Sequence, residues 1–314
     1  MEKPYYDLNS YLRARFGERV DKICLDGGFT CPNRDGRVGR GGCLFCGERG
    51  AGEEILCPDA AVGEQMRRGI LHAEESGRGV RRFIAYFQNF CGTYAKISDL
   101  RRIYDAALTD ARTVGLAVAT RPDCVDGAVA DLLAEYAARG YFVWVELGLQ
   151  TASDEVAAQM HIGYPRARFS EAVSLLASRG IEVVAHMMLG LPGEGLAESI
   201  HTAEFLNRHA VSGLKLHATY VLADSGLASL YTRGEYTPLT REEYIARVCE
   251  VLAHLRPDLV IHRLTGDPPR ALLLAPDWCR EKIEVLNCIH RYMREAGLRQ
   301  GCRYSLPPQA DTVQ

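Results

Sequence analysis

The sequence lacks the features that would place the protein in a membrane or outside the cell. No stretch approaches the roughly 18 consecutive apolar residues that a transmembrane helix needs. The first seven residues, MEKPYYD, are polar and charged and do not resemble a signal peptide. We therefore expect a cytoplasmic protein without a membrane partner, in which the eleven cysteines remain reduced.

A strong charge of either sign is also missing. The net charge is −3 over 314 residues, which gives no general signal of polyanion binding and excludes no such partner. With 47% apolar and 25% charged residues, the composition is that of an ordinary globular protein. No low-complexity segment or linker marks a second domain, so one barrel with appendages is expected.

Apolar runs and helical stretches alternate along the chain. The runs, which suit parallel strands, cover residues 20–26, 82–87, 114–120, 141–147, 181–188 and 214–220. Helices are expected at 59–76, 98–111, 126–139, 168–178 and 194–207. This order predicts an α/β fold, a partial (βα)6 TIM-like barrel with a C-terminal extension. We expect an N-terminal helical segment at 1–19, the barrel at 20–235, and an extension at 236–314 that packs on the barrel.

Three cysteines lie in a glycine-rich loop after the first predicted strand. Cys31, Cys43 and Cys46 have the spacing C-x11-C-x2-C, and Phe45 directly precedes the last of them. Three thiolates could hold a [4Fe-4S] cluster and leave one iron free for a small molecule. With Cys24 added, four thiolates could instead hold a structural zinc ion. The loop alone leaves both readings open, although a cysteine within an apolar strand is more often a buried apolar side chain.

Polar residues fall at the carboxyl ends of the later strands, which is the face where barrel enzymes place their reactive sites. They are Gln88, Asn89, Thr120, Arg121, Glu146, Gln150, His186 and His217. Alternation along the fourth strand places Glu146 and Gln150 on one face. A carboxylate that faces a barrel interior needs polar partners, so these residues are candidate ligand contacts. The two histidines could equally be core residues.

Five segments, taken in order, resemble the radical S-adenosylmethionine (SAM) superfamily. They are GFTCPNR at 28–34, YFQ at 86–88, TRPD at 120–123, GLQT at 148–151 and GLPGE at 190–194. The chain most resembles a compact bacterial subfamily that is similar to the radical SAM domain of the elongator catalytic subunit. This resemblance implies a [4Fe-4S] cluster on the three loop cysteines and SAM as the second cofactor.

The resemblance also implies residue roles at the SAM site. Phe45 would lie near the adenine, Gln88-Asn89 near the amino group, and Gln150 and His186 near the ribose or carboxylate. Arg121 could pair with the carboxylate, and Thr120 and Glu146 complete the candidate set. Two departures stand out, since relatives have three residues between the first two cysteines and often an arginine where this chain has Ile162. Arg166 or Arg168 could replace that arginine.

The resemblance implies reductive cleavage of SAM to a 5′-deoxyadenosyl radical, tRNA as a partner, and a reductant such as flavodoxin or ferredoxin. The expected substrate is the tRNA wobble uridine, whose carboxymethylaminomethyl side chain would be remodelled to aminomethyl. Nothing after the barrel has the length of the elongator's acetyltransferase domain. Arg34, Arg37 and Arg40 could contact RNA phosphates. A radical SAM enzyme for a small metabolite and a zinc-stabilised binding module remain the alternatives.

Overall fold

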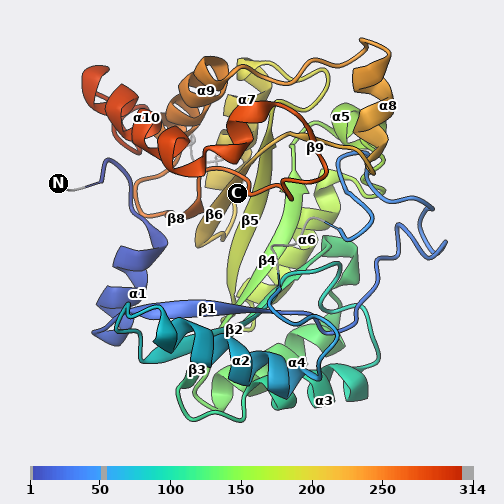
Figure 1. The fold of residues 1–314 in the computed structure, drawn as a ribbon, viewed down its shortest axis with the longest axis vertical. Coiled ribbons are helices and arrows are strands. Elements are labelled where there is room, and N and C mark those ends of the chain that lie inside the picture. The colour runs from blue at the N-terminus through green and yellow to red at the C-terminus, as the bar shows by residue number, and fades with distance from the viewer. Residues whose placement is uncertain (1–2, 51–54, 306–314) are drawn as a thin grey trace, which may run out of the picture.

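The protein is described by a computed structural model that covers residues 3–50 and 55–305. Seven parallel strands form one curved sheet in chain order, β1-β2-β3-β4-β5-β6-β8 (Figure 1). Their bounds are β1 Val20–Leu25, β2 Arg82–Phe87, β3 Thr113–Thr120, β4 Phe142–Gln150, β5 Glu182–Leu189, β6 Gly213–Ala218 and β8 Val260–Arg263. The predicted α/β partial barrel is confirmed. The sheet has one strand more than the six predicted, because β8 of the C-terminal extension pairs with β6.

A layer of helices covers the outer face of this sheet. It consists of α2 Val62–Glu75, α3 Ile97–Ala107, α4 Gly127–Ala138, α6 Arg166–Ala177, α7 Leu196–Asn207 and α9 Arg241–His254. Their apolar side chains pack on the outward-facing strand residues and form the main core. The side chain of Asp126 accepts a hydrogen bond from the Val129 amide at 2.9 Å, so it caps α4 as its position in the sequence suggests.

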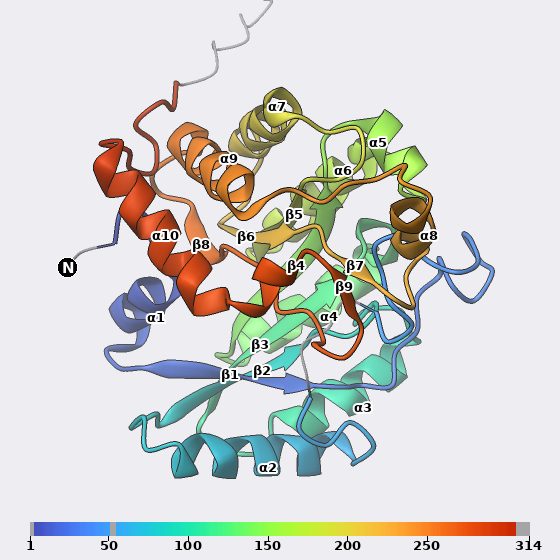
Figure 2. The same cartoon turned by 45° about the horizontal axis from the view of Figure 1, so that its top comes forward.

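The inner face of the sheet holds a second, smaller core. Ile84, Tyr86, Phe142 and Trp144 meet there with Leu12 of α1 Leu8–Phe16. Helix α1 contacts both β1 and β8, the two edge strands of the open barrel (Figure 2). It therefore lies across the gap between these edges. In the part of the chain that the structure describes, no helix is long and apolar enough to cross a membrane.

The cysteine loop lies at the opposite end of the barrel, among short elements. These are α5 Asp154–Gln159, α8 Gly226–Thr232, the antiparallel pair β7 Val221–Leu222 and β9 Leu273–Ala275, and the 3-10 turn η1 Pro122–Cys124. The 3-10 turn η2 Asp277–Arg280 follows β9 and leads into α10 Lys282–Glu295, which packs on α9. The amide of Leu44 donates to the Met160 carbonyl at 3.0 Å, and the Leu44 carbonyl accepts from the Leu227 amide at 2.8 Å. These two backbone bonds fix the loop between the segment after α5 and the start of α8.

Candidate active site

One cavity of about 150 Å³ opens at the carboxyl ends of the strands. Ten of the eleven residues that the resemblance assigns to the cluster or to SAM line it: Cys31, Cys43, Phe45, Cys46, Gln88, Thr120, Arg121, Glu146, Gln150 and His186. Asn89 does not line it, because its side-chain amide lies against Asp26 and donates to that carboxylate at 3.3 Å. His217 lines the same cavity. Residues from the cysteine loop and from five strand ends thus face one space.

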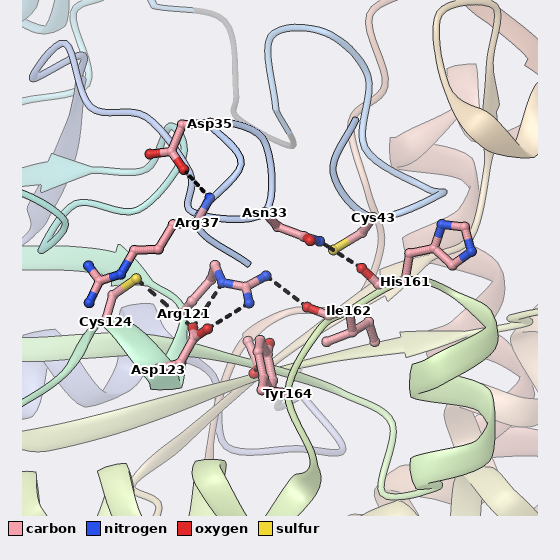
Figure 3. A network of polar contacts seen from close by, with 11 residues as sticks. Asn33, Asp35, Arg37, Cys43, Arg121, Asp123, Cys124, His161, Ile162 and Tyr164 are labelled. Carbon is pink, nitrogen blue, oxygen red and sulfur yellow. Dashed lines mark hydrogen bonds and ion pairs between the residues drawn. The ribbon is translucent and has the colours of Figure 1, made fainter. Parts of the chain in front are cut away.

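Two side chains brace the long gap between Cys31 and Cys43. The amide nitrogen of Asn33 donates to the His161 carbonyl at 2.6 Å and lies 3.5 Å from the Cys43 sulfur (Figure 3). The Arg34 guanidinium donates to the Gly47 carbonyl at 2.6 Å. Arg34 is therefore tied to the loop itself, whereas Arg37 and Arg40 are exposed. Of the three arginines expected to contact RNA phosphates, Arg37 and Arg40 are exposed and Arg34 is half-buried.

The surroundings of the loop favour the thiolate form at Cys31 and Cys43. A hydrogen bond from the Cys91 thiol lowers the pKa of Cys31 to about 6, with help from the Asn33 amide and from the charge of Arg121. A hydrogen bond from Cys46 lowers the pKa of Cys43, and the same contact raises the pKa of Cys46. The pair therefore accepts a first negative charge more readily than a second. Thiolates are the form in which cysteine binds iron.

The donor set fits a three-thiolate cluster. Cys31, Cys43 and Cys46 line one cavity, whereas Cys24 lies on β1 opposite Tyr86 and does not reach it. Among the described residues, no three cysteine, histidine or acidic side chains gather closely enough to hold a single metal ion. A four-iron cluster binds each thiolate through a different iron, so its ligands stand further apart than those of one zinc ion. The four-thiolate zinc site that includes Cys24 does not match this arrangement.

Arg121 joins the end of β3 to the segment that follows β4. Its guanidinium donates to both oxygens of Asp123, at 2.9 and 2.8 Å, and to the Ile162 carbonyl at 2.8 Å (Figure 3). It also lies over the Tyr164 ring, 4.7 Å from its centre. Three of the five guanidinium N–H groups are thus used within the protein, and the side chain still borders the cavity. Arg121 therefore acts mainly as a structural part of the cavity wall.

Neither candidate substitute for the arginine of the relatives reaches the cavity. Arg166 donates to the Ala152 carbonyl at 2.9 Å, and Arg168 pairs with Glu171 at 2.7 Å. Ile162 itself lines the cavity. The contact that this arginine makes in relatives has no counterpart from Arg166 or Arg168.

A fully buried carboxylate, Glu146, forms the inner wall of the cavity. It accepts hydrogen bonds from Tyr86 at 2.5 Å, Trp144 at 3.1 Å, His186 at 2.7 Å and Lys215 at 3.1 Å. Burial alone would raise the pKa of Glu146, but the positive charges of Lys215 and Lys22 hold it well below its usual range. The carboxylate is therefore ionised, and the polar partners that its position demands are present.

Several residues at or beside the cavity were not predicted from the sequence. Lys215 interrupts an apolar strand two positions before His217. A lysine at such a position indicates a buried charge that needs a partner, and this pattern could have identified it. Tyr164 lines the cavity and donates to the Gly148 carbonyl at 2.7 Å. The residues around it in the sequence show no pattern that would predict this position. Cys91 follows the second strand, but only the fold brings its thiol into contact with Cys31.

Comparisons with known proteins agree with this geometry. Residues 33–206 match the model of the Radical SAM superfamily, and residues 211–295 match that of the Radical_SAM C-terminal domain. Protein YhcC of Escherichia coli K12 is 38% identical over 299 residues, which are 95% of each chain. Uncharacterized protein YtqA of Bacillus subtilis is 37% identical over 303 residues, which are 96% of this chain and 92% of that protein.

Two elongator proteins are also similar. Elongator complex protein 3 of Homo sapiens is 31% identical over 179 residues, which are 54% of this chain and 32% of that protein. The structure of the archaeal Methanocaldococcus infernus Elp3 has a TM-score of 0.69 at 18% sequence identity. That match covers 90% of this chain and 64% of the archaeal chain, and it shows a shared fold.

The cysteine assignment can be tested by anaerobic reconstitution with iron and sulfide. Alanine at Cys31, Cys43 or Cys46 should abolish binding of a [4Fe-4S] cluster, because each substitution removes one of three thiolate ligands. Iron and sulfide content and the electron paramagnetic resonance of the reduced protein measure this. Cys24→Ala and Cys91→Ala are matched controls and should retain the cluster. Loss of all metal in Cys24→Ala, with zinc alone in the wild type, would contradict the assignment.

The buried ion pair predicts a stability effect. Lys215→Ala leaves the Glu146 carboxylate buried without its closest cation, so the free energy of unfolding should fall by about 3–5 kcal/mol. The double variant Glu146→Gln/Lys215→Met removes both charges and should recover more than half of this loss. Urea unfolding followed by circular dichroism measures both. Lys282→Ala, which breaks an ion pair with Asp267 near the surface, should leave stability almost unchanged.

Proposed function

Because the chain belongs to the radical SAM superfamily, we propose that it uses SAM to remodel the side chain of the tRNA wobble uridine from carboxymethylaminomethyl to aminomethyl. It is a radical SAM enzyme, and its cofactors are a [4Fe-4S] cluster and SAM. The observation that carries the proposal is the single cavity in which the three loop cysteines face polar side chains from several strand ends. The substrate assignment is supported by the similarity to Elongator complex protein 3.

Cys31, Cys43 and Cys46 would hold the cluster, and SAM would lie between them and the strand ends. When bound, the two cofactors together supply a 5′-deoxyadenosyl radical that abstracts a hydrogen atom from the substrate. Phe45 lines the cavity from the cysteine loop, and Gln88, Gln150 and His186 line it from the ends of β2, β4 and β5. We assign SAM contacts to these four residues. Asn89 is assigned none, because its amide lies against Asp26.

Thr120 and Arg121 have positioning roles in this proposal. The Thr120 hydroxyl lies 2.7 Å from that of Thr93, and Arg121 is tied to Asp123 and Ile162. The Thr93 contact ties the end of β3 to the segment after β2, and the Arg121 bond to Ile162 ties it to the segment after β4. They fix the width of the cavity in which SAM would bind, and they place a positive charge beside the cysteine loop.

Hydrogen abstraction suits the proposed substrate chemistry. The carboxymethyl group carries a carbon between an amine and a carboxylate, and a hydrogen atom on that carbon is the one that the 5′-deoxyadenosyl radical would abstract. The proposed partners are tRNA and a one-electron reductant such as flavodoxin or ferredoxin. Arg37 and Arg40 offer exposed positive charge on the cysteine loop, close to the cavity that the reacting base would enter.

The decisive experiment compares tRNA nucleosides, by mass spectrometry, from cells with and without the gene. Deletion should remove aminomethyl-type wobble uridines and accumulate the carboxymethylaminomethyl form. The wild-type gene should restore the profile, and a gene encoding Cys43→Ala should not. If the nucleoside profile is unchanged although the protein still cleaves SAM, the substrate is a small metabolite and not tRNA.

The RNA contact predicts an effect of charge reversal on the cysteine loop. Arg37→Glu/Arg40→Glu should weaken tRNA binding and lower the slope of log K against log salt by about one per lost phosphate contact. Titration at several salt concentrations measures this, and SAM cleavage without tRNA should persist. The matched control is Arg67→Glu/Arg68→Glu on α2, an equal charge change on the outer helix layer. Equal weakening by both variants would indicate a general charge effect and no contact at the loop.

A further inference from the structure

The long gap between Cys31 and Cys43 holds a side-chain amide against one of the cysteine sulfurs. The gap folds back on itself, and the Gly42 amide donates to the Asn33 carbonyl at 2.9 Å. Asn33 lies inside this folded gap and is 4% exposed. Its Nδ2 atom lies 3.5 Å from the Sγ atom of Cys43 (Figure 3). A buried hydrogen-bond donor is therefore placed at a sulfur that is assigned to the cluster.

The orientation of the Asn33 amide is determined by its second bond. The same Nδ2 atom lies 2.6 Å from the His161 carbonyl oxygen, and only the nitrogen end of the amide can donate to a carbonyl. This nitrogen carries two N–H groups, so one bonds to His161 and the other is directed to Cys43. His161 has a φ of 54°, a conformation that residues other than glycine keep only where their surroundings hold it. The donor is thus fixed by a segment outside the loop.

A glycine makes room for this amide. A Cβ atom at residue 39 would lie 2.4 Å from the Oδ1 atom of Asn33, which is too close for any side chain. Gly39 therefore allows the gap to close over Asn33 and to shield its amide from water. Shielding strengthens a hydrogen bond, because the local dielectric is low and no water competes for the donor.

Hydrogen bonds to the cysteine sulfurs are among the factors that set the reduction potential of an iron–sulfur cluster. Reduction adds negative charge, and the thiolate sulfurs carry part of it. A donor at such a sulfur stabilises the reduced state more than the oxidised state, because hydrogen bonds to charged acceptors are stronger. The donor therefore raises the reduction potential.

We propose that the Asn33 side chain donates a hydrogen bond to Cys43 that raises the reduction potential of the cluster and so favours the electron transfer that SAM cleavage requires. Asn33 acts through Cys43 and contacts neither SAM nor substrate in this proposal, so it is a positioning residue. The inference rests on the part of the proposed function that places the cluster on the three loop cysteines. The tRNA assignment does not enter it.

Redox titration of the reconstituted protein without SAM, followed by electron paramagnetic resonance, measures the reduction potential. Asn33→Leu removes the donor and keeps a side chain of similar size, which excludes water from the site. The equilibrium constant for reduction should fall about tenfold, which corresponds to about 59 mV for one electron. Asn33→Asp should lower the potential further, because it places a negative charge beside the sulfur. The matched control is Val38→Ala, a neutral and exposed residue of the same gap, which should leave the potential unchanged.

The sign of the shift separates this role from a merely structural one. A loop that only loosened would admit water, whose dipoles stabilise the more negative reduced cluster and raise its potential. An unchanged or higher potential in Asn33→Leu would therefore overturn the proposal. A shift in Val38→Ala as large as that in Asn33→Leu would also overturn it. Circular dichroism and iron content of each variant establish that it folds and holds its cluster.

A measurement on the wild type keeps the test independent of the variants. Protein labelled with nitrogen-15 in its asparagine side chains should show a nitrogen-15 coupling in the pulsed electron paramagnetic resonance of the reduced cluster. The reason is that Nδ2 of Asn33 lies within hydrogen-bond distance of a ligand sulfur. Unlabelled protein is the control. A labelled protein without this coupling would refute the hydrogen bond even if Asn33→Leu failed to hold a cluster.

The outcomes also separate this inference from the proposed function. If the cluster binds and Asn33→Leu keeps the potential of the wild type, the role of Asn33 is refuted and the proposed function stands. If the wild type binds no [4Fe-4S] cluster, the proposed function fails and this inference fails with it. If the potential falls as expected while gene deletion leaves tRNA unchanged, the role of Asn33 stands and only the substrate assignment fails.

Discussion

The buried carboxylate of Glu146 is the constraint on which the inside of this barrel depends. An ionised group without water must be compensated by hydrogen bonds and opposite charge. Its four donors come from four different strands, with Tyr86 on β2, Trp144 on β4, His186 on β5 and Lys215 on β6. A shift of one residue in β2, β5 or β6 would turn that strand's donor to the other face of the sheet. The hydrogen bonds of Glu146 therefore form only in the observed register of the strands, and that register sets the shape of the cavity wall.

The opposite wall of the cavity is built differently, from a loop without regular structure. Its position is determined by a few specific bonds: Leu44 to the segments beside it, Asn33 to His161, and Arg34 to Gly47. Arg121 adds a link between β3 and the segment after β4. A loop of this kind can carry an eleven-residue gap between its first two cysteines, because side chains within the gap hold both ends together.

The two walls divide the chemistry of the site between them. The loop wall brings thiols and the charge of Arg121, which suit a cluster and an anionic cofactor group. The strand wall brings neutral histidines that are backed by the buried ion pair of Glu146 and Lys215. A ligand between them would meet thiolates on one side and neutral histidines on the other. The proposed reaction requires a substrate that fits this asymmetry.

Local patterns in the sequence determined the fold class, the six barrel strands, the cysteine loop and ten residues that line the cavity. They could do so because strand periodicity, cysteine spacing and polar residues at strand ends are properties of short segments. Tertiary structure alone decided that β8 joins the sheet and places Arg263 beside Lys215. It also decided that Arg34 braces its own loop, that Asn89 turns to Asp26, and that Cys91, and not Cys24, adjoins Cys31. Each of these outcomes depends on which distant segments meet and in what register. A short segment of sequence does not determine those long-range contacts by itself.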